Sequence, residues 1–526
     1  MNNVNLSNAL VAQLEERQPP ELNVASSNLA ERAPRAGGRR LLPPAFLLLA
    51  LVAPGSAVGG PRVLWTIPAV AVTATESAKW ALRAVPDGRG GLIVAWEENR
   101  GKRVCCRDTR DLYCQRLDAS GARLWGDTDF QLAATAAGEE IEGMVPSMDG
   151  GALILWRRGM GTLVVQQLDG ERKPMLGPDG WIAAATAAVC DWGPSTCFAT
   201  DDAASSAVIA WGSPSDGGGS AIRVLRFSRS ASAWSAHPVT DAVAEADVHP
   251  AAVVWCGAGR WLVLVWTGGD PVRLDGIWLG ADGLPAGKRF RVAEEPKGSY
   301  LHVEASGDGR GGAWAAWGSV IPDRMERMHR VGVASIERRK DGSARVLRGA
   351  GGQARTLAMF IGPTMVAVGN QPEEPATIPS VAWRATALIA GAGPDAAVLA
   401  RTDGTRMIAA VVRRSEGRLA VGAPVTLGES FYSGFSPVVM PLARGRVALA
   451  WADTAAGGYR MAIRRLLVAN GRLRDEGGSA AVDGPPGLSP RCGFLVGLDD
   501  GAVGMAWSGH YSSDHGGVVA QKVAWR

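Results

Sequence analysis

Charged and histidine side chains follow a series of short apolar segments along the chain. Glu97 and Arg100 follow the first such segment, and Arg157 and Arg158 follow the second. Equivalent places in later segments hold Asp270, Asp403, Asp453, His510, Asp514 and His515. Polar groups that a rigid scaffold presents on loops are typical of ligand binding. We expect these residues to form the ligand-binding set, with a solvated rim as the alternative because their charges differ from segment to segment.

The stretch "SGHYSSDHGG" at 508–517 holds two histidines and one aspartate close together. Such a set could bind a metal ion, but a glycine-rich loop holds its ligands loosely and the spacing matches no helix-borne motif. The sequence therefore predicts no metal ion and no other cofactor.

Catalytic motifs are weak or missing. "SMDGGALI" at 147–154 is close to the Asp-box of sialidases, S-x-D-x-G-x-x-W, but it lacks the final aromatic residue, so we expect a turn. The chain contains no glycine-rich phosphate loop, no G-x-S-x-G elbow and no H-E-x-x-H. Glycosidase chemistry needs two carboxyl groups about 5–10 Å apart, which spacing in the sequence does not test. No catalytic residue is predicted.

The segments that position these residues repeat along the chain. "GGLIVAW" ends at Trp96 and "GGALILW" at Trp156, and related segments end at Trp211, Trp266, Trp317, Trp451 and Trp507. An eighth copy, "PDAAVLA", ends at Ala400 without the tryptophan. The copies recur at intervals of about 55 residues, a self-similarity that indicates a repeat architecture. One longer interval, before Ala400, indicates an insertion around 350–380.

The first copy shows how one repeat is built. It contains short strands over 80–85 and 92–96, joined by the hairpin turn "PDGRGG", and two further strands over 111–121 and 122–133. Four antiparallel strands in each repeat, with turn signals and no helical period, are typical of a propeller blade. The predicted fold class is all-β: a single β-propeller of eight four-stranded blades, or of seven if the copy at Ala400 is misassigned.

The two ends of the chain predict how the ring closes. The last repeat stops after three strands, and residues 61–73, "PRVLWTIPAVAVT", resemble the fourth strand of the first repeat. We therefore expect this amino-terminal strand to complete the last blade, which removes exposed sheet edges. The tryptophans that end the second strands sit in apolar runs, so we expect them to pack between neighbouring sheets, with a sugar-binding platform as the alternative.

The repeats resemble those of secreted bacterial β-propeller proteins, a largely uncharacterised group. They match its D-G-x-G-G-x-x-V-A-W-x-D-x-R opening and its Q-R-L/V-D-x-x-G-x-x-x-W close, well in the first repeat and in part elsewhere. The resemblance implies a scaffold that binds other molecules or shapes the cell surface. It implies no catalytic residue.

The amino-terminal region carries the features of an export signal. Arg39 and Arg40 precede the apolar run "LLPPAFLLLALVAP", so residues 39–57 are expected to be a signal peptide. Residues 1–38 are then either a mis-annotated start or a disordered extension, and 60–526 are the propeller domain. The apolar run is shorter than the ~20 residues of a spanning helix, so no transmembrane span is expected in the mature chain.

Composition narrows the class of function. The formal charge is +4 at pH 7 and no basic run is interleaved with aromatic residues, so we expect no nucleic acid as a partner. Seven cysteines fit an oxidising compartment, and Cys190 and Cys197 flank a Gly-Pro turn and are the expected disulfide. We predict a secreted or periplasmic monomer, a non-enzymatic binding or scaffold protein that recognises protein or glycan through its loop face. The alternative is a propeller-type carbohydrate hydrolase or lyase.

Overall fold

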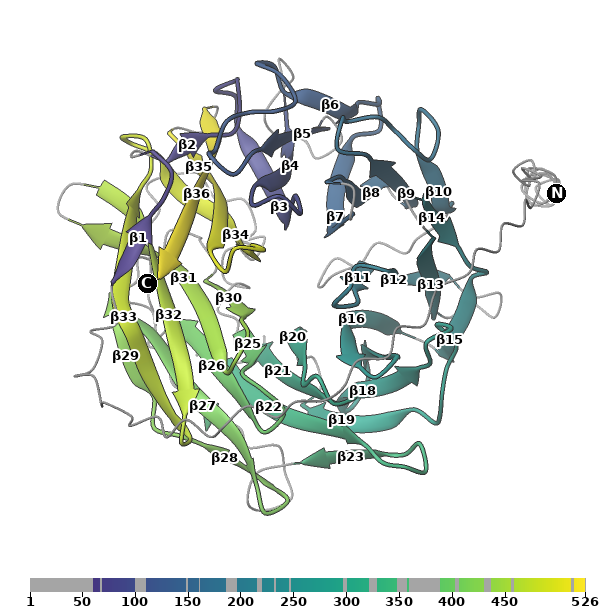
Figure 1. Ribbon diagram of the computed structural model, residues 1–526. Coiled ribbons are helices and arrows are strands. Elements are labelled where there is room, and N and C mark those ends of the chain that lie inside the picture. The colour runs from purple at the N-terminus through teal and green to yellow at the C-terminus, as the bar shows by residue number, and fades with distance from the viewer. Residues whose placement is uncertain are drawn as a thin grey trace, which may run out of the picture. The chain divides into compact units, whose positions relative to one another are not determined.

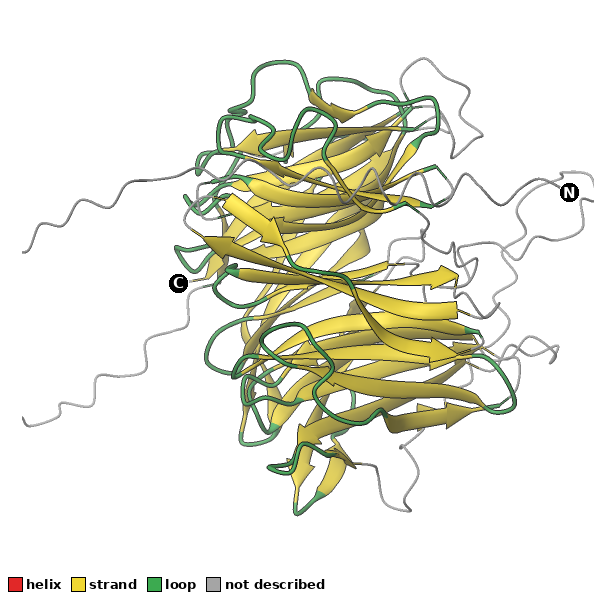
Figure 2. Ribbon diagram, turned by 90° about the vertical axis from the view of Figure 1, so that its right-hand side faces the viewer, coloured by secondary structure: helices red, strands yellow, loops and turns green. Residues whose placement is uncertain are grey.

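Antiparallel strands make up the regular structure of the described chain (Figures 1 and 2). The computed structural model describes residues 60–66, 69–99, 110–147, 150–159, 161–185, 196–214, 220–230, 233–245, 247–296, 300–320, 329–347, 357–358, 388–402, 406–429, 437–455, 458–511 and 515–525. Ala57–Arg526 form one compact unit. The extension expected at 1–38 and the signal peptide expected at 39–57 lie outside the described residues. In the described part of the chain, no helix is long and apolar enough to cross a membrane.

The first four blades follow one another along the chain, and each pairs its strands in sequence order. Blade one contains β3 (Lys79–Pro86), β4 (Leu92–Glu98), β5 (Asp111–Leu117) and β6 (Phe130–Ala133). Blade two contains β7 (Glu139–Pro146), β8 (Ala152–Arg158), β9 (Thr162–Leu168) and β10 (Trp181–Ala184). Blade three contains β11 (Thr196–Thr200), β12 (Ser206–Pro214), β13 (Ser220–Ser230) and β14 (Ala233–Ala236), and β15 (Thr240–Glu245) also pairs with β13. Blade four contains β16 (Val248–Gly257), β17 (Arg260–Thr267), β18 (Val272–Leu279) and β19 (Phe290–Glu295).

The remaining four blades complete the ring. Blade five contains β20 (Tyr300–Gly307), β21 (Ala313–Val320), β22 (His329–Arg338) and β23 (Ala344–Leu347), and β24 (Leu357–Ala358) pairs with β22. Blade six contains β25 (Leu388–Gly391), β26 (Ala396–Thr402), β27 (Arg406–Ser415) and β28 (Arg418–Val421), and β29 (Val425–Glu429) pairs with β27. Blade seven contains β30 (Val438–Pro441), β31 (Arg446–Ala455), β32 (Gly458–Ala469) and β33 (Arg472–Asp483). Blade eight contains β34 (Ser489–Gly497), β35 (Val503–His510) and β36 (Gly516–Trp525). The predicted eight-bladed propeller is confirmed, and the copy that ends at Ala400 is a true blade.

The amino-terminal strand closes the ring as expected. β1 (Pro61–Val63) and β2 (Val70–Ala71) both pair antiparallel with β36, with Pro61 opposite Trp525 and Val70 opposite Ala520. In Figure 1 these purple strands lie against the yellow carboxy-terminal blade. Blade eight therefore takes its outer strand from the opposite end of the chain, which leaves β36 no free edge over this stretch.

The hydrophobic core is divided into eight clusters, each between two neighbouring blades. On β4, Val94 and Trp96 face blade eight, and Ile93 and Ala95 face blade two. Both faces of a second strand are therefore covered, which explains its unbroken run of apolar residues. The tryptophans that end the second strands are at most 6 % exposed, so their expected packing between sheets is confirmed. At about 25 cal/mol per Å² and roughly 200 Å² buried, each contributes at most about 5 kcal/mol of hydrophobic free energy.

Contacts in blade one explain why the D-G-x-G-G opening and the Q-R-L close recur in the repeats. Asp87 accepts the amide protons of Arg89 and Gly91 through Oδ1, at 2.8 and 2.7 Å, and pairs with Arg116 through Oδ2. A Cβ at Gly91 would lie 2.0 Å from the carbonyl oxygen of Leu117, so the last glycine of the turn has no room for a side chain. The opening of the motif, in the β3–β4 turn, and its Q-R-L close, on β5, therefore meet at one end of the blade.

The outer strands are shorter than the sequence predicted. β5 ends at Leu117, and β6 covers only Phe130–Ala133, where strands were expected over 111–121 and 122–133. The intervening residues form turns, in which the carboxylate of Asp118 accepts the amide protons of Ser120 and Ala122. Side-chain to backbone bonds of this kind compete with the ladder, so the strand stops there.

Candidate functional site

The first strand of each blade lies at the inner edge of its sheet and faces the centre of the ring (Figure 1). The first strands of neighbouring blades contact one another around this centre. A cavity of about 670 Å³ lies among them and is lined from six strands: β11, β16, β20, β25, β30 and β34. A cavity of this size is in the range of small-molecule sites.

The wall of the cavity is mostly apolar. It is built largely from small residues, aliphatic residues and two aromatic residues, among them Val253, Trp255, Ile389, Met440 and Phe494. The glycines among the lining residues leave parts of the wall as bare backbone. An apolar wall of this kind binds the hydrophobic body of a ligand and leaves orientation to a few polar groups.

Glu304 is the polar side chain of the wall that lacks a partner. It lies on β20 opposite Ala316, one residue after Val303, which pairs with Trp317. No described residue forms a hydrogen bond or an ion pair with its carboxyl group. The side chain keeps partial access to solvent through the cavity. Burial raises the pKa of Glu304 from 4.5 to about 7, so the carboxyl group is close to half protonated at neutral pH.

The other two carboxyl groups at the cavity are already bound. Asp308 accepts the amide protons of Arg310 and Gly312 and pairs with Arg414 of the next blade at 2.8 Å. Asp202 accepts the indole proton of Trp255 at 3.1 Å. Both side chains therefore take part in contacts of the wall, whereas Glu304 has no such contact with a described residue.

A second acidic residue, Glu142, lies near the same part of the ring. Its Oε1 accepts a hydrogen bond from Nε of Arg157 at 3.0 Å, and burial raises its pKa despite that guanidinium. Cys197 of β11 is buried near both acids. Burial raises the pKa of its thiol most, and the negative charges of Glu142 and Glu304 raise it further. A thiol with a raised pKa is a poor nucleophile, so Cys197 does not have the environment of a catalytic cysteine.

Glu97 and Arg157, two of the expected ligand-binding residues, are paired with other residues of the protein instead. Glu97 is fully buried, pairs with Arg110 at 2.8 Å and accepts the amide proton of Ile141 from blade two at 2.9 Å. Burial raises the pKa of Glu97 to about 7 even though the charge of Arg110 lowers it. Arg157 pairs with Glu140 as well as with Glu142. These groups therefore have protein partners.

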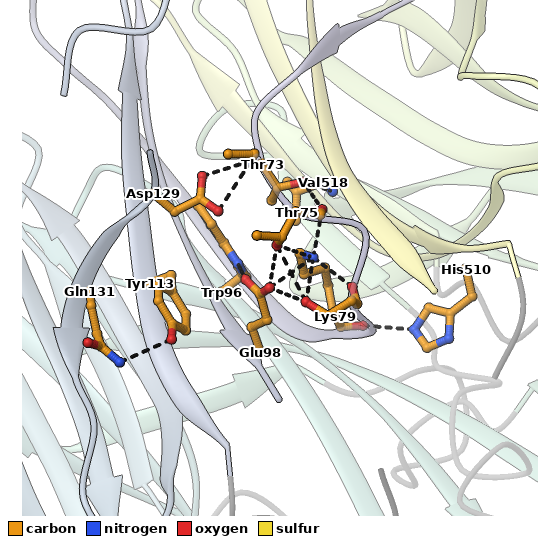
Figure 3. A network of polar contacts seen from close by, with 12 residues as sticks. Thr73, Thr75, Lys79, Trp96, Glu98, Tyr113, Asp129, Gln131, His510 and Val518 are labelled. Atoms are coloured by element: carbon orange, nitrogen blue, oxygen red, sulfur yellow. Dashed lines mark hydrogen bonds and ion pairs between the residues drawn. The ribbon is translucent and has the colours of Figure 1, made fainter. Parts of the chain in front are cut away.

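The two histidines lie at the seam where the ring closes, and Figure 3 shows His510 beside Lys79. His510 donates from Nε2 to the carbonyl oxygen of Lys79 at 2.8 Å and meets the ring of Trp80 edge-on. His515 forms a bridge with Ser77 across the same seam. Their position gives both residues a part in holding blade one against blade eight.

The other expected ligand residues are scattered. Asp453 pairs with Arg460 at 2.9 Å, Arg158 donates to the carbonyl oxygen of Asp179, and Asp270 is exposed. None of the described members of the set lines the cavity. Further members lie outside the described residues: Arg100, Asp403 and Asp514. The described residues contain no group of three His, Cys, Asp or Glu side chains that could hold a metal ion.

The expected disulfide also falls partly outside the described chain. Cys197 carries a free, buried thiol on β11, and Cys190 lies outside the described residues, so this disulfide stays a prediction. The sialidase-like stretch forms the turn between β7 and β8, with the Ser147 amide bonded to the Gly151 carbonyl oxygen, although Met148 and Asp149 within it are not described.

Sequence reasoning missed Glu304, although a signal was present. The first strand of repeat five, "YLHVEASG", places one charged residue in a stretch whose neighbours are apolar or small. The residues expected to bind a ligand lie on the loops after the second strands, whereas the cavity is lined by the first strands. A charged residue in a first strand, next to the residue that pairs with the repeated tryptophan, is the signal that could have found it.

The likeness of the chain to known proteins is slight. No protein-family model and no curated protein matches the chain. Among solved structures, the Dos1 propeller has a TM-score of 0.41 at 9 % identity, over 86 % of this chain and 95 % of that one. The BP39L lectin from Burkholderia pseudomallei has a TM-score of 0.41 at 15 % identity, over 78 % of this chain and 100 % of that one. The Hadza microbial sialidase Hz136 has a TM-score of 0.35 at 13 % identity, over 70 % of this chain and 73 % of that one.

Proposed function

We propose that this protein is a non-enzymatic binding protein that holds part of its ligand in the central cavity of the propeller. The observation that carries the proposal is the cavity itself: about 670 Å³, a mostly apolar wall, and one carboxyl group without a protein partner. Binding sites combine an apolar enclosure with a few polar groups that fix orientation, and this wall has that composition.

The partners of the other charged groups support binding over catalysis. Glu97, Asp308 and Arg157 form ion pairs that join strands or blades. Glycoside hydrolysis needs two carboxyl groups that act together, and in this wall two of the three acids are held by other residues. The ligand is then a protein or a glycan with a group small enough to enter the cavity. We place the protein outside the cytoplasm, on the strength of the signal peptide expected at 39–57.

A carbohydrate hydrolase or lyase is the second candidate, and one observation favours it. Glu142 and Glu304 both have raised pKa values, and both lie close enough to Cys197 to influence its thiol. A carboxyl group with a raised pKa is suited to act as a general acid. The ion pair of Glu142 with Arg157 opposes this role, because it occupies the second carboxylate.

The test uses the chain from residue 60 to residue 526. Glycan arrays and pull-downs identify ligands, and the methyl signal of Met440, assigned by its loss in Met440→Leu, reports whether a hit enters the cavity. A hit that shifts this signal without turnover supports binding. If the protein hydrolyses glycosides, and both Glu304→Gln and Glu142→Gln abolish this activity, the protein is a hydrolase and the proposal is wrong. Hits that leave the Met440 signal unchanged would place the binding site elsewhere.

A further inference from the structure

The charges of the cavity wall all have one sign. The lining residues include three acidic side chains, Asp202, Glu304 and Asp308, and no lysine, arginine or histidine. Asp308 is neutralised by Arg414 and Asp202 is bound to Trp255. Asp202 keeps its charge, but it is exposed to water. Among the described residues, Glu304 is the lining carboxyl group that has neither a hydrogen bond nor a countercharge.

We propose that Glu304 anchors a primary ammonium group, and that the apolar body attached to this group fills the rest of the cavity. The inference rests on the proposed function and names its ligand class. A buried carboxylate is costly when it is unpaired, and an entering cation supplies the missing charge. The cation then gains from the low polarity of the wall, which strengthens its attraction to the carboxylate.

The apolar wall determines what is attached to the ammonium group. Val253, Ile389, Val438 and Met440 offer aliphatic surface, and Phe494 adds an aromatic ring. Each buried methylene of a ligand contributes roughly 0.8 kcal/mol against such a surface. An alkyl chain that ends in an ammonium group fits both parts of the site. The side chain of lysine has this chemistry, and so does a free alkylamine.

The affinity for an amine should rise with pH, because the surroundings of Glu304 determine when its carboxyl group ionises. Three titratable groups face the same region: Cys197 on β11, Asp202 in the turn after β11, and Asp308 in the turn after β20. The lining residues of β16, β25, β30 and β34 carry no titratable side chain. Burial raises the pKa of Glu304 to about 7, so ionisation of this carboxyl group follows pH through the neutral range. An amine stays protonated there, so its affinity rises by about tenfold from about pH 6 to about pH 8.

The test compares hexylamine with its neutral analogue hexan-1-ol by calorimetry, on the chain 60–526. We expect hexylamine to bind more tightly at pH 8 than at pH 6, and hexan-1-ol to bind weakly at both. Glu304→Gln is expected to lose at least tenfold in affinity for hexylamine and to leave hexan-1-ol unchanged. Asp341→Asn is the matched control: it removes the same charge from an exposed turn of the same blade and leaves both affinities unchanged. Equal binding of amine and alcohol, or full hexylamine affinity in Glu304→Gln, overturns the inference.

A second arm separates the two sources of the ammonium group. The peptide acetyl-Gly-Lys-Gly-amide tests a lysine side chain, and hexylamine tests a small amine. Glu304-dependent binding of either supports the inference and identifies its source. If neither binds while a hit from the ligand screen still shifts the Met440 signal, the ammonium assignment is wrong and the proposed function stands. If no compound shifts that signal, both are wrong.

Discussion

Nε2 of His510 donates to the carbonyl oxygen of Lys79 at 2.8 Å, although these two residues are 431 positions apart in the chain. The bond joins the second strand of the last blade to the first strand of blade one. Beside it, the ammonium group of Lys79 lies 3.3 Å from the carboxylate of Glu98, and both side chains are fully buried (Figure 3). The hydroxyl groups of Thr75 and Ser77 donate to the same carboxylate. The seam of the ring is therefore held by polar contacts in addition to the β1–β36 ladder.

We predict that the closing strands are needed for stability. A chain that begins at residue 60 keeps β1 and β2, and a chain that begins at residue 74 loses both. The shorter chain exposes the edge of β36, so we expect a lower Tm and aggregation. Thermal unfolding and light scattering compare the two chains directly. Equal Tm values for them would show that the ladder to β36 adds nothing to the stability of the ring.

Removal of one member of the buried pair is expected to be more harmful than removal of both. Lys79→Met removes the ammonium group that lies 3.3 Å from the buried Glu98 carboxylate. A loss of about 3–5 kcal/mol in unfolding free energy is typical when one partner of a buried ion pair is removed. Lys79→Met combined with Glu98→Gln removes both charges and should recover part of this loss. Urea unfolding of the two variants and the parent measures the difference. A double variant less stable than the single one contradicts the prediction.

Most of what the sequence could predict came from the repeat, because every blade carries the same pattern of turn residues and buried strand residues. Trp96 marks the end of a buried second strand, and Ala400 still marked the sixth blade without the tryptophan because its neighbours kept the pattern. The use of His510 was not predictable, since its partner is distant in the chain and is a backbone carbonyl that any residue could provide. Glu304 was missed for a related reason. Its role depends on which strands surround the central cavity, and a single repeat does not contain that information.

Replacement by phenylalanine should lower the unfolding free energy by different amounts at two equivalent tryptophans, Trp317 and Trp211. The indole nitrogen of Trp317 donates to Glu295 at 2.9 Å, whereas that of Trp211 has no hydrogen-bond partner. Both side chains are 1 % exposed, so the loss of apolar contact is similar. Trp317→Phe also takes a donor from the buried carboxylate, so we expect an additional loss of about 1–3 kcal/mol relative to Trp211→Phe. Chemical denaturation measures both variants, and equal losses would argue against a contribution from this bond.

The last glycine of the hairpin motif, Gly91, should not tolerate even a methyl group. In Gly91→Ala the new Cβ meets the Leu117 carbonyl oxygen at 2.0 Å, so the backbone of the hairpin must move. Overpacking of this kind costs about 1–3 kcal/mol. Gly422→Ala is the control, because its Cβ would lie 3.5 Å from the nearest atom, an ordinary contact. We expect a lower Tm only in Gly91→Ala, and similar Tm values for the two variants would contradict the close approach.

Glu304→Gln should make the protein more stable at alkaline pH. Burial raises the pKa of Glu304 from 4.5 to about 7, so between these values the folded protein keeps a proton that the unfolded chain has released. This proton favours the folded state at low pH, and the benefit is lost as the pH rises from 4.5 through 7. Glutamine stays neutral at every pH and has no ion pair to lose at this site. The variant should therefore match the parent near about pH 4 and exceed it by at most about 3 kcal/mol near about pH 8. Urea unfolding across this range checks the sign: a variant that is less stable than the parent at the alkaline end would mean that the carboxylate has a stabilising partner. The gain would identify Glu304 as a residue kept at a cost in stability, which is typical of a binding group.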